Sequence, residues 1–343
     1  MKAIQIPSLQ KIEVINIDKP ATPAADEVLI SLQYVGFCGS DLNTFLGRNG
    51  MAKENVIPGH EVGAVIEAVG SNVPDTLRPG MVVTVNPYTN CGHCASCRNG
   101  RVNACQHNET LGVQRDGAMR ELMLLPWQKI IPAEGLDTKT CAIIEPMSVG
   151  FHAVDRAQVQ DIDKVMVIGC GMVGLGAVVR AALRGATVIA ADLDDEKLAL
   201  AKKLGATYTI NTKTEDAHQR LAELTEGLGP DVIVEAVGSV PTYQLAVNEV
   251  AFTGRIACIG YAKQDAELPT RLFVQKELDV RGSRNAMPND FRAVIHYLKN
   301  ADCPTEELIS KVIKPEESQE TMEYWAQNPG KVFRILVDFT KQN

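Results

Sequence analysis

The chain has 343 residues, more than one typical domain, and 45% of them are hydrophobic, which is enough to bury sizeable cores. Its 34 basic and 42 acidic residues give a formal charge of −8, which argues against a nucleic-acid-binding protein with the usual basic face. No apolar run approaches the roughly 20 residues that cross a bilayer, and the first residues lack a signal-peptide pattern, so we expect a cytoplasmic protein without a membrane partner.

The first 130 residues predict short β-strands separated by turns. Runs rich in β-branched residues occupy positions 28–37, 62–70 and 81–88, and turn signals such as VPD and RPG lie between them. This pattern predicts a compact, barrel-like antiparallel module.

Four cysteines are grouped in one loop: Cys91, Cys94, Cys97 and Cys105. Gaps of two residues let neighbouring thiolates converge on one tetrahedral ion, and a fourth cysteine a short distance away closes the site. Nine cysteines without an export signal favour a reducing compartment, where spaced cysteines more often bind metal than form disulfides. We therefore predict a structural zinc site with no open position. The alternatives are disulfides, or His93 or His107 as a ligand in place of one cysteine.

From residue 163 onward, short apolar strands alternate with helical stretches. The expected strands are residues 165–169, 187–192, 206–210, 231–238, 255–260 and 277–283. This alternation predicts an α/β fold with a parallel sheet covered on both faces, and six strands make two mononucleotide-binding halves. After residue 290 mixed segments return, and we expect the final apolar run, 331–339, to rejoin the first module.

A G-x-G-x-x-G motif follows the first of these strands and opens a helix: Gly169, Gly171, Met172, Val173 and Gly174. Its glycines permit a tight turn, close approach to a pyrophosphate and close helix–sheet packing, and the helix N-terminus offers N–H groups to phosphates. Asp192 ends the next strand, where an acid hydrogen-bonds a ribose 2′-hydroxyl, and no arginine lies beside it for a 2′-phosphate. The pattern predicts NAD rather than NADP. The alternative is an ordinary strand–turn–helix connection with a solvated acidic loop.

A second set of metal-ligand types is dispersed along the chain: Cys38, His60, Glu61 and Glu145. Alone, a buried cysteine or a histidine in a turn more often serves packing than metal binding. Together they supply one thiolate, one imidazole and one or two carboxylates, the donor set of a catalytic zinc with an open position.

The motifs and their order along the chain resemble those of zinc-containing medium-chain alcohol and polyol dehydrogenases. These motifs are GFCGSD, PGHE, the four-cysteine loop, IEPMSVG and the glycine motif. The resemblance covers essentially the whole chain and is strongest to the sorbitol (L-iditol) dehydrogenase and sugar-acid dehydrogenase branch, in which a glutamate of the IEP type replaces a second catalytic-site cysteine. It implies a GroES-like β-rich catalytic domain, formed by residues 1–150 and 290–343. Residues 151–289 would form an inserted Rossmann domain that binds NAD.

The resemblance also implies roles for single residues. Cys38 and His60 would be zinc ligands, Glu61 a third ligand, and Glu145 would bind the ion directly or through its water; the order of the two carboxylates stays open. Ser40, the third catalytic residue beside Glu61 and Glu145, would receive the substrate's hydroxyl proton.

Asp41 would orient His60 through its other ring nitrogen. Ordinary turn chemistry is the alternative for Asp41, as it is for Ser40. Relatives often carry histidine where Asn43 stands, so the proton path must end differently or use water. The usual glycine of GHE-x-x-G is Ala64 here, which affects the expected turn but not the ligands.

Three residues are expected near the substrate: Arg120, Arg284 and Asn285. A guanidinium can bind a carboxylate through two hydrogen bonds or contact neighbouring hydroxyls, although a surface salt bridge is the alternative for both arginines. The remaining cysteines are expected to be structural thiols: Cys141, Cys170, Cys258 and Cys303.

These observations predict a zinc-dependent oxidoreductase that transfers a hydride from a secondary hydroxyl of a polyol, sugar or aldonic acid to NAD. The nearest alternative is a threonine or simple-alcohol dehydrogenase of the same fold. A non-catalytic NAD-binding sensor would not need an open metal site, and a nucleic-acid regulator would need a basic face. Relatives are commonly dimers or tetramers, so we expect a homodimer or homotetramer that binds a small-molecule substrate.

Overall fold

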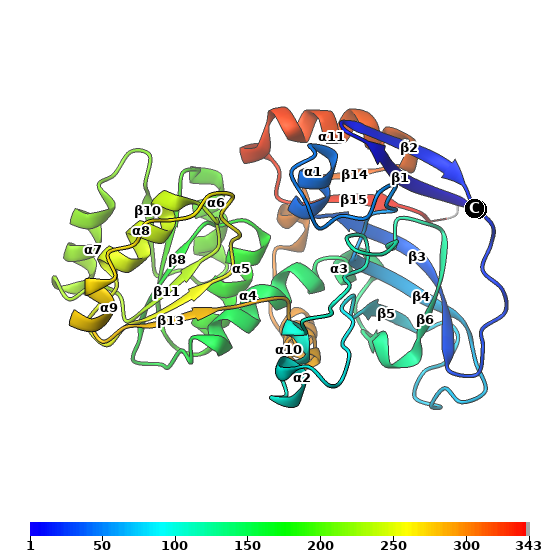
Figure 1. The fold of residues 1–343 in the computed structure, drawn as a ribbon, viewed down its shortest axis with the longest axis horizontal. Helices are drawn as coiled ribbons and strands as arrows, with labels where there is room; N and C mark the ends of the chain where they lie inside the picture. Colours follow the sequence, from blue (N-terminus) through cyan, green and yellow to red (C-terminus); the bar gives the residue numbers. More distant parts are fainter. Residues whose placement is uncertain (341–343) are drawn as a thin grey trace. The chain divides into compact units, whose positions relative to one another are not determined.

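The computed structural model describes residues 1–340, and the chain divides into two compact units (Figure 1). Unit 1 contains Met1–Glu145 and Met287–Asn343, and unit 2 contains Pro146–Ala286. Among the described residues, every helix is too short or too polar to cross a membrane. Both ends of the chain therefore contribute to unit 1, whereas unit 2 is a single continuous stretch.

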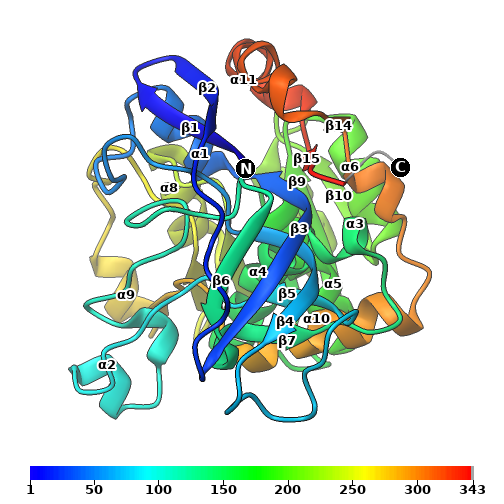
Figure 2. The ribbon, with the colours of Figure 1, turned by 90° about the vertical axis from the view of Figure 1, so that its right-hand side faces the viewer.

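Unit 1 is built on a seven-stranded sheet, of which Figure 2 gives a clear view. Its strands are β3 (Glu27–Phe37), β4 (Glu61–Val69), β5 (Val82–Val85), β6 (Leu122–Pro126), β7 (Ile130–Pro132), β14 (Lys311–Ile313) and β15 (Ile335–Asp338). The long strand β3 pairs antiparallel with β4, β6 and β15. In this way the last strand of the chain is joined to the strand that precedes Cys38.

The rest of unit 1 surrounds this sheet. A two-stranded hairpin, β1 (Lys2–Ser8) and β2 (Lys11–Asn16), starts the chain. The helices are α1 (Gly39–Phe45), α2 (Ala95–Arg98), α3 (Thr138–Cys141), α10 (Pro288–Asn300) and α11 (Ser318–Gln327). Short 3-10 turns are η1 (Val102–Ala104), η2 (Trp127–Lys129), η3 (Thr305–Leu308), η4 (Pro315–Glu317) and η5 (Pro329–Lys331). Apolar residues from the hairpin, the sheet and α11 form one buried core.

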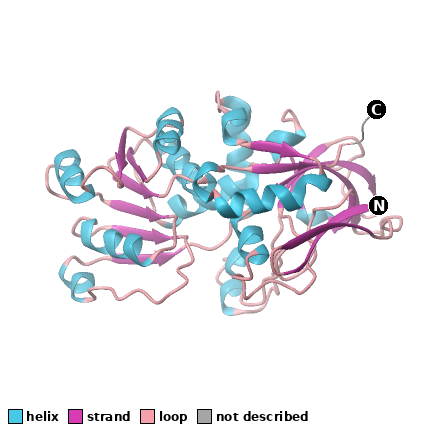
Figure 3. Ribbon diagram, turned by 90° about the horizontal axis from the view of Figure 1, so that it is seen from above, coloured by secondary structure: helices cyan, strands magenta, loops and turns pink. Residues whose placement is uncertain are grey.

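Unit 2 is a six-stranded parallel sheet with helices on both of its faces, as Figure 3 shows. The strands, in spatial order, are β10 (Tyr208–Asn211), β9 (Thr187–Asp192), β8 (Lys164–Ile168), β11 (Val232–Glu235), β12 (Arg255–Cys258) and β13 (Asp279–Gly282). The helices are α4 (Ile144–Arg156, which begins in unit 1), α5 (Met172–Leu183), α6 (Asp195–Lys203), α7 (Ala217–Thr225), α8 (Val240–Glu249) and α9 (Arg271–Gln275). Because both faces are covered, the central strands are continuous apolar runs rather than alternating ones.

The predicted α/β fold, with a β-rich GroES-like module and a doubly wound parallel sheet, is confirmed. Several strand predictions were too long, among them 81–88 in unit 1 and 231–238 in unit 2, where the strand is only Val232–Glu235. The run at 81–88 is extended only over Val82–Val85, because Asn86 begins a turn in which its side-chain oxygen accepts from the Tyr88 backbone at 3.1 Å. The run at 331–339 is a strand only from Ile335 to Asp338, since its start belongs to the 3-10 turn that Pro329 opens.

Candidate zinc and dinucleotide sites

Cys38 lies where β3 ends and α1 begins. It is the N-cap of α1, and its backbone N–H donates to Oδ2 of Asp41 at 2.8 Å. The buried Asp41 therefore closes the first turn of the helix around Cys38. The sequence suggested that Asp41 orients His60, but within the described residues Asp41 Oδ1 and His60 Nδ1 have no hydrogen-bond partner, so that role stays a prediction. The hydrogen bond to the Cys38 backbone shows that Asp41 fixes the turn that carries the thiol.

Glycines create the space in which Glu61 is buried. Gly36 is the β-partner of Glu61, and a Cβ added at Gly36 would lie 2.2 Å from the Glu61 carboxylate. Gly59 has a φ of +100°, and a Cβ there would lie within 2.9 Å of Met119 and Val35 side chains. A larger residue at either position would displace the segment that carries His60 and Glu61.

The structure brings three of the four dispersed residues together. Cys38, His60 and Glu61 each place one side-chain donor atom within 4.8 Å of the other two. The His60 side chain is 5% exposed and that of Glu61 is 0% exposed. Across residues 1–340, Ser40 Oγ, Asp41 Oδ1 and His60 Nδ1 are buried without a hydrogen-bond partner. A thiol, an imidazole and a carboxylate at this spacing fit a zinc ion that retains an open position.

Glu145, the fourth residue, lies beside this group in contact with Tyr88. The Tyr88 hydroxyl donates to the Glu145 carboxylate, and both side chains are buried. Burial, followed by the charge of Glu145, raises the pKa of Tyr88 well above its usual value. The negative charge of Glu145 also contributes to the raised pKa of His60, which places this carboxylate within electrostatic reach of the cluster. Tyr88 was not recognised from the sequence.

Arg334 is a second residue that sequence reasoning missed. Its Nη1 lies 2.9 Å from Glu61 Oε1 and donates to the Phe37 carbonyl at 2.6 Å, and the side chain is 5% exposed. Burial raises the pKa of Glu61 well above its usual value, and the Arg334 guanidinium acts against this rise. The only sequence signal is an arginine flanked on both sides by apolar residues, in the segment VFRILV.

The charges around Cys38 favour the thiolate. Burial alone would raise the pKa of Cys38, but the charge and hydrogen bond of His60, together with Arg334, lower it to about 7. Burial would likewise lower the pKa of His60, but Cys38, Glu145 and Asp41 raise it well above its usual value. Several negatively charged groups thus surround one imidazole, an arrangement that a divalent cation would stabilise.

The four-cysteine loop folds into a compact group of thiols. The Sγ atoms of Cys91, Cys94, Cys97 and Cys105 lie within 4.8 Å of one another, and all four are free. Cys94 Sγ is 3.6 Å from that of Cys97 and 3.8 Å from that of Cys105. Backbone N–H groups of Cys97 and Gln106 lower the pKa of Cys94 to about 6. This closed set of thiolates fits a structural zinc, and disulfides are absent from the described chain.

The glycine motif has the geometry that a dinucleotide needs. Gly169 follows β8 with a φ of +93°, and Gly171 is the N-cap of α5, which begins at Met172. Asp192 ends β9, and its carboxylate accepts from the backbone N–H of Cys170 at 2.7 Å. The acid that ends the second strand is therefore tied to the phosphate-binding turn, as in dinucleotide-binding folds.

The first and third glycines of this motif are in close contact. A Cβ at Gly174 would lie 1.7 Å from the Gly169 carbonyl oxygen, whereas a Cβ at Gly171 would have no neighbour within 4 Å. We expect Gly174→Ala to force α5 away from β8, which lowers the thermal stability of unit 2 and abolishes NAD binding.

Gly171→Ala is the matched control: the fold should be retained, and only NAD affinity should fall, because the methyl group meets the pyrophosphate. Circular dichroism melting and calorimetric NAD titration measure the two effects. Equal melting temperatures for the two variants would contradict this assignment.

The predicted substrate residues lie in different units. Arg120, in unit 1, is half-buried and donates from Nε to the Gly117 carbonyl at 2.9 Å. Burial lowers the pKa of Arg120. Arg284 and Asn285, in unit 2, follow β13, and Asn285 has a φ of +56°. Their contact with substrate stays a prediction.

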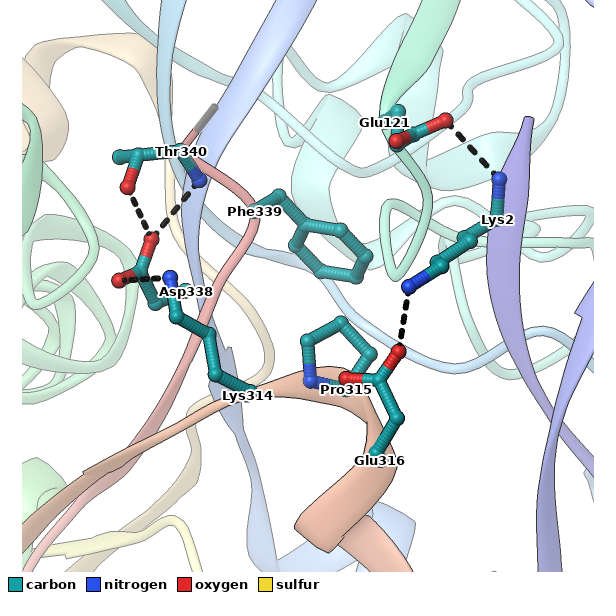
Figure 4. Close-up of a pocket in the computed structure, with 8 residues that line it drawn as sticks. All are labelled: Lys2, Glu121, Lys314, Pro315, Glu316, Asp338, Phe339 and Thr340. Carbon is teal, nitrogen blue, oxygen red and sulfur yellow. Dashed lines mark hydrogen bonds and ion pairs between the residues drawn. The ribbon is translucent and has the colours of Figure 1, made fainter. Parts of the chain in front are cut away.

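A surface cavity of about 440 Å³ lies in unit 1, and none of these residues lines it (Figure 4). It is lined by Lys2, Glu121, Lys314, Pro315, Glu316, Asp338, Phe339 and Thr340. Its lysines form ion pairs with acids of the same cavity, Lys2 with Glu316 and Lys314 with Asp338. The cavity shares no residue with either cysteine-containing group or with the glycine motif.

Comparison with known proteins agrees with this geometry. Residues 24–135 match the alcohol dehydrogenase GroES-like domain family, and residues 173–300 match the zinc-binding dehydrogenase family. Sorbitol dehydrogenase of Bacillus subtilis is 33% identical over 98% of this chain and 97% of its own. L-galactonate-5-dehydrogenase of Escherichia coli is 32% identical over 79% of this chain and 80% of its own. The crystal structure of the alcohol dehydrogenase RspB of E. coli CFT073 in complex with NADH superposes with a TM-score of 0.89, at 30% identity, over 98% of this chain and 99% of that one.

The fold, the two cysteine-containing groups and the glycine motif define a zinc-binding, dinucleotide-dependent oxidoreductase. The chain belongs to the zinc-type medium-chain alcohol dehydrogenase family, in its sorbitol and sugar-acid dehydrogenase branch. Zinc and NAD are accordingly its cofactors.

Proposed function

We propose that this enzyme oxidises a secondary hydroxyl of a polyol, a sugar or a sugar acid and transfers the hydride to NAD. The group formed by the half-buried Cys38 and the buried His60 and Glu61 is the observation that carries the proposal, because its three donors leave a position open. The names of its relatives, a sorbitol dehydrogenase and an L-galactonate-5-dehydrogenase, support this substrate class.

Each residue near the ion would have a distinct role. Bound zinc would lower the pKa of the substrate hydroxyl and stabilise the developing alkoxide, and bound NAD would accept the hydride. Cys38, His60 and Glu61 would hold the ion, and the Arg334 guanidinium favours the charged form of the Glu61 carboxylate against the effect of burial. Tyr88 holds Glu145 at the edge of the group, where it can bind the ion or orient a water beside it.

Ser40 is the proposed acceptor of the hydroxyl proton. Its buried Oγ has no hydrogen-bond partner within the described residues and lies two positions after Cys38. Asn43, one turn further along α1, has no titratable group that could carry the proton outward. We therefore propose that a water molecule relays the proton from Ser40 to solvent.

Asp192 is proposed to select NAD. Asp192→Ala should weaken NAD binding about 10- to 100-fold, the effect of losing a charged hydrogen bond to the ribose, and should lower the preference for NAD over NADP. The kcat/KM values for the two cofactors measure this preference.

Asp194→Ala is the control for Asp192, because the Asp194 carboxylate caps α6 by accepting from Glu196 and Lys197 and lies in the same loop. It should leave the cofactor preference intact. An unchanged NAD/NADP ratio in Asp192→Ala would remove Asp192 from the ribose site.

The decisive test of function is NADH formation with a panel of polyols, aldonic acids, threonine and simple alcohols, each with and without a zinc chelator. Chelator-sensitive turnover of polyols or sugar acids is the expected result. Turnover restricted to sugar acids would support a carboxylate contact with Arg120 or Arg284. Turnover restricted to threonine or simple alcohols would contradict the proposed substrate class. NAD binding without turnover of any compound would favour a sensor.

We also propose a cytoplasmic location and a homo-oligomeric state. All nine cysteines are free, which is the usual condition in a reducing compartment. Light scattering on the purified protein distinguishes a monomer from the expected dimer or tetramer.

A further inference from the structure

A third group of metal-ligand atoms lies on the outside of the four-cysteine loop. Donor atoms of Cys91, His93 and His107 lie within 4.8 Å of one another. Both histidines are exposed, and their ring centroids are 6.1 Å apart with an angle of 31° between the planes. The proposed reaction uses neither ring.

The His93 ring is held in the orientation that metal-binding histidines commonly adopt. Its Nδ1 lies 2.9 Å from the backbone oxygen of Cys91, and a carbonyl oxygen can only accept a hydrogen bond. Nδ1 of the neutral ring therefore carries the proton, and Nε2 keeps a lone pair for a ligand. Such a bond to the second ring nitrogen fixes the tautomer and the ring direction of metal ligands.

The backbones of both histidines are connected to the four-cysteine group. The His107 N–H donates to Cys105 Sγ at 3.3 Å. The Cys91 sulfur accepts a hydrogen bond from the backbone N–H of His93. A metal ion held by the four thiolates would fix these hydrogen bonds, so that both imidazoles are presented from a rigid loop.

We propose that Cys91, His93 and His107 form a second, exposed metal site, which binds a zinc-like divalent ion and shares the Cys91 thiolate with the buried four-cysteine site. Two imidazoles and one thiolate suit zinc, cobalt and nickel, and do not suit magnesium or calcium, which prefer oxygen. Water completes the coordination because the two histidines are open to solvent. Four thiolates around one divalent ion retain excess negative charge, which stabilises a second cation at the shared sulfur.

Cobalt tests this site in the enzyme that carries its resident zinc. After equilibrium dialysis against Co²⁺, elemental analysis should find one additional cobalt per chain with the zinc content unchanged. A sulfur-to-cobalt charge-transfer absorption should accompany it and report the shared thiolate. The proposal would be overturned if cobalt bound only in exchange for zinc, or if the enzyme bound no additional cobalt. Cobalt bound without this absorption would overturn the sharing of Cys91.

Variants of the two histidines assign the position of the ion. His93→Gln and His107→Gln should each weaken cobalt binding by more than about tenfold, since even an outer-sphere partner has an effect of this size. The double variant should bind no additional cobalt. The exposed His296, on α10, is the matched control, and His296→Gln should bind cobalt as the unmodified enzyme does. Equal cobalt binding by the double variant would refute the site.

Discussion

Arg334→Met is expected to destabilise unit 1 by about 3–5 kcal/mol in the zinc-depleted enzyme, because it leaves the Glu61 carboxylate buried without its ion-pair partner. Glu61 is fully buried, and the Nη1–Oε1 distance is 2.9 Å, so solvent cannot replace the lost charge. Both tryptophans, Trp127 and Trp325, belong to unit 1. Urea unfolding followed by tryptophan fluorescence therefore reports on this unit.

The pH dependence of this effect has a definite sign. Burial raises the pKa of Glu61 in the folded protein, and removal of Arg334 raises it further. The folded state then binds a proton more readily than the unfolded state, so the loss of stability is smallest at acidic pH. It grows as the pH increases through the pKa of the buried carboxyl group.

Arg78→Met is the matched control for Arg334→Met. Arg78 pairs with Glu134 at 3.0 Å, but the two side chains are 65% and 54% exposed. Loss of such a surface pair changes the free energy of unfolding by less than about 1 kcal/mol. The double variant Arg334→Met/Glu61→Gln should recover much of the stability, since it removes the isolated charge. Similar losses for Arg334→Met and Arg78→Met would show that the Glu61–Arg334 pair does not stabilise the core.

Cys38→Ala should lower turnover by about three orders of magnitude or more while NAD binding persists. Loss of the thiolate ligand removes zinc from the catalytic group, and the metal's stabilisation of transition-state charge amounts to several kcal/mol, with each 1.4 kcal/mol equal to a factor of ten. The glycine motif lies in unit 2 and does not depend on this ligand. Steady-state kinetics, zinc analysis and NAD titration measure the three quantities.

Cys141→Ala separates the loss of a metal ligand from the loss of a buried thiol. Cys141 is fully buried in unit 1, outside both cysteine-containing groups, and burial raises the pKa of its thiol. We expect this variant to keep its turnover and zinc content. Normal turnover in Cys38→Ala would eliminate the catalytic role of Cys38.

Local patterns were sufficient for much of the molecule. The alternation of strands and helices after residue 163 predicted the parallel sheet, and the glycine motif predicted the turn between β8 and α5. The four-cysteine loop assembles from residues close in the chain, so its spacing alone indicated a metal site. In each case the sequence separation is short enough for local geometry to fix the arrangement.

Contacts between distant segments could not be predicted in this way. Arg334 meets Glu61 only because β15 and β4 lie on either side of β3, a register that no local pattern specifies. Tyr88 reaches Glu145 from the turn after β5, and Gly36 makes room for a side chain on the neighbouring strand. The family resemblance supplied the ligands, whereas the groups that balance their charge became visible only in three dimensions.

The division of the chain has a consequence for biosynthesis. Unit 2 is complete once residue 286 has been made, but the edge of β3 at Tyr34–Phe37, directly before Cys38, pairs with β15, which emerges after unit 2. Unpaired strand edges are prone to association with other chains. The nascent enzyme can therefore form its nucleotide-binding unit on the ribosome while the edge of β3 stays exposed. Arg334, the ion-pair partner of Glu61, likewise emerges only after unit 2 has been made.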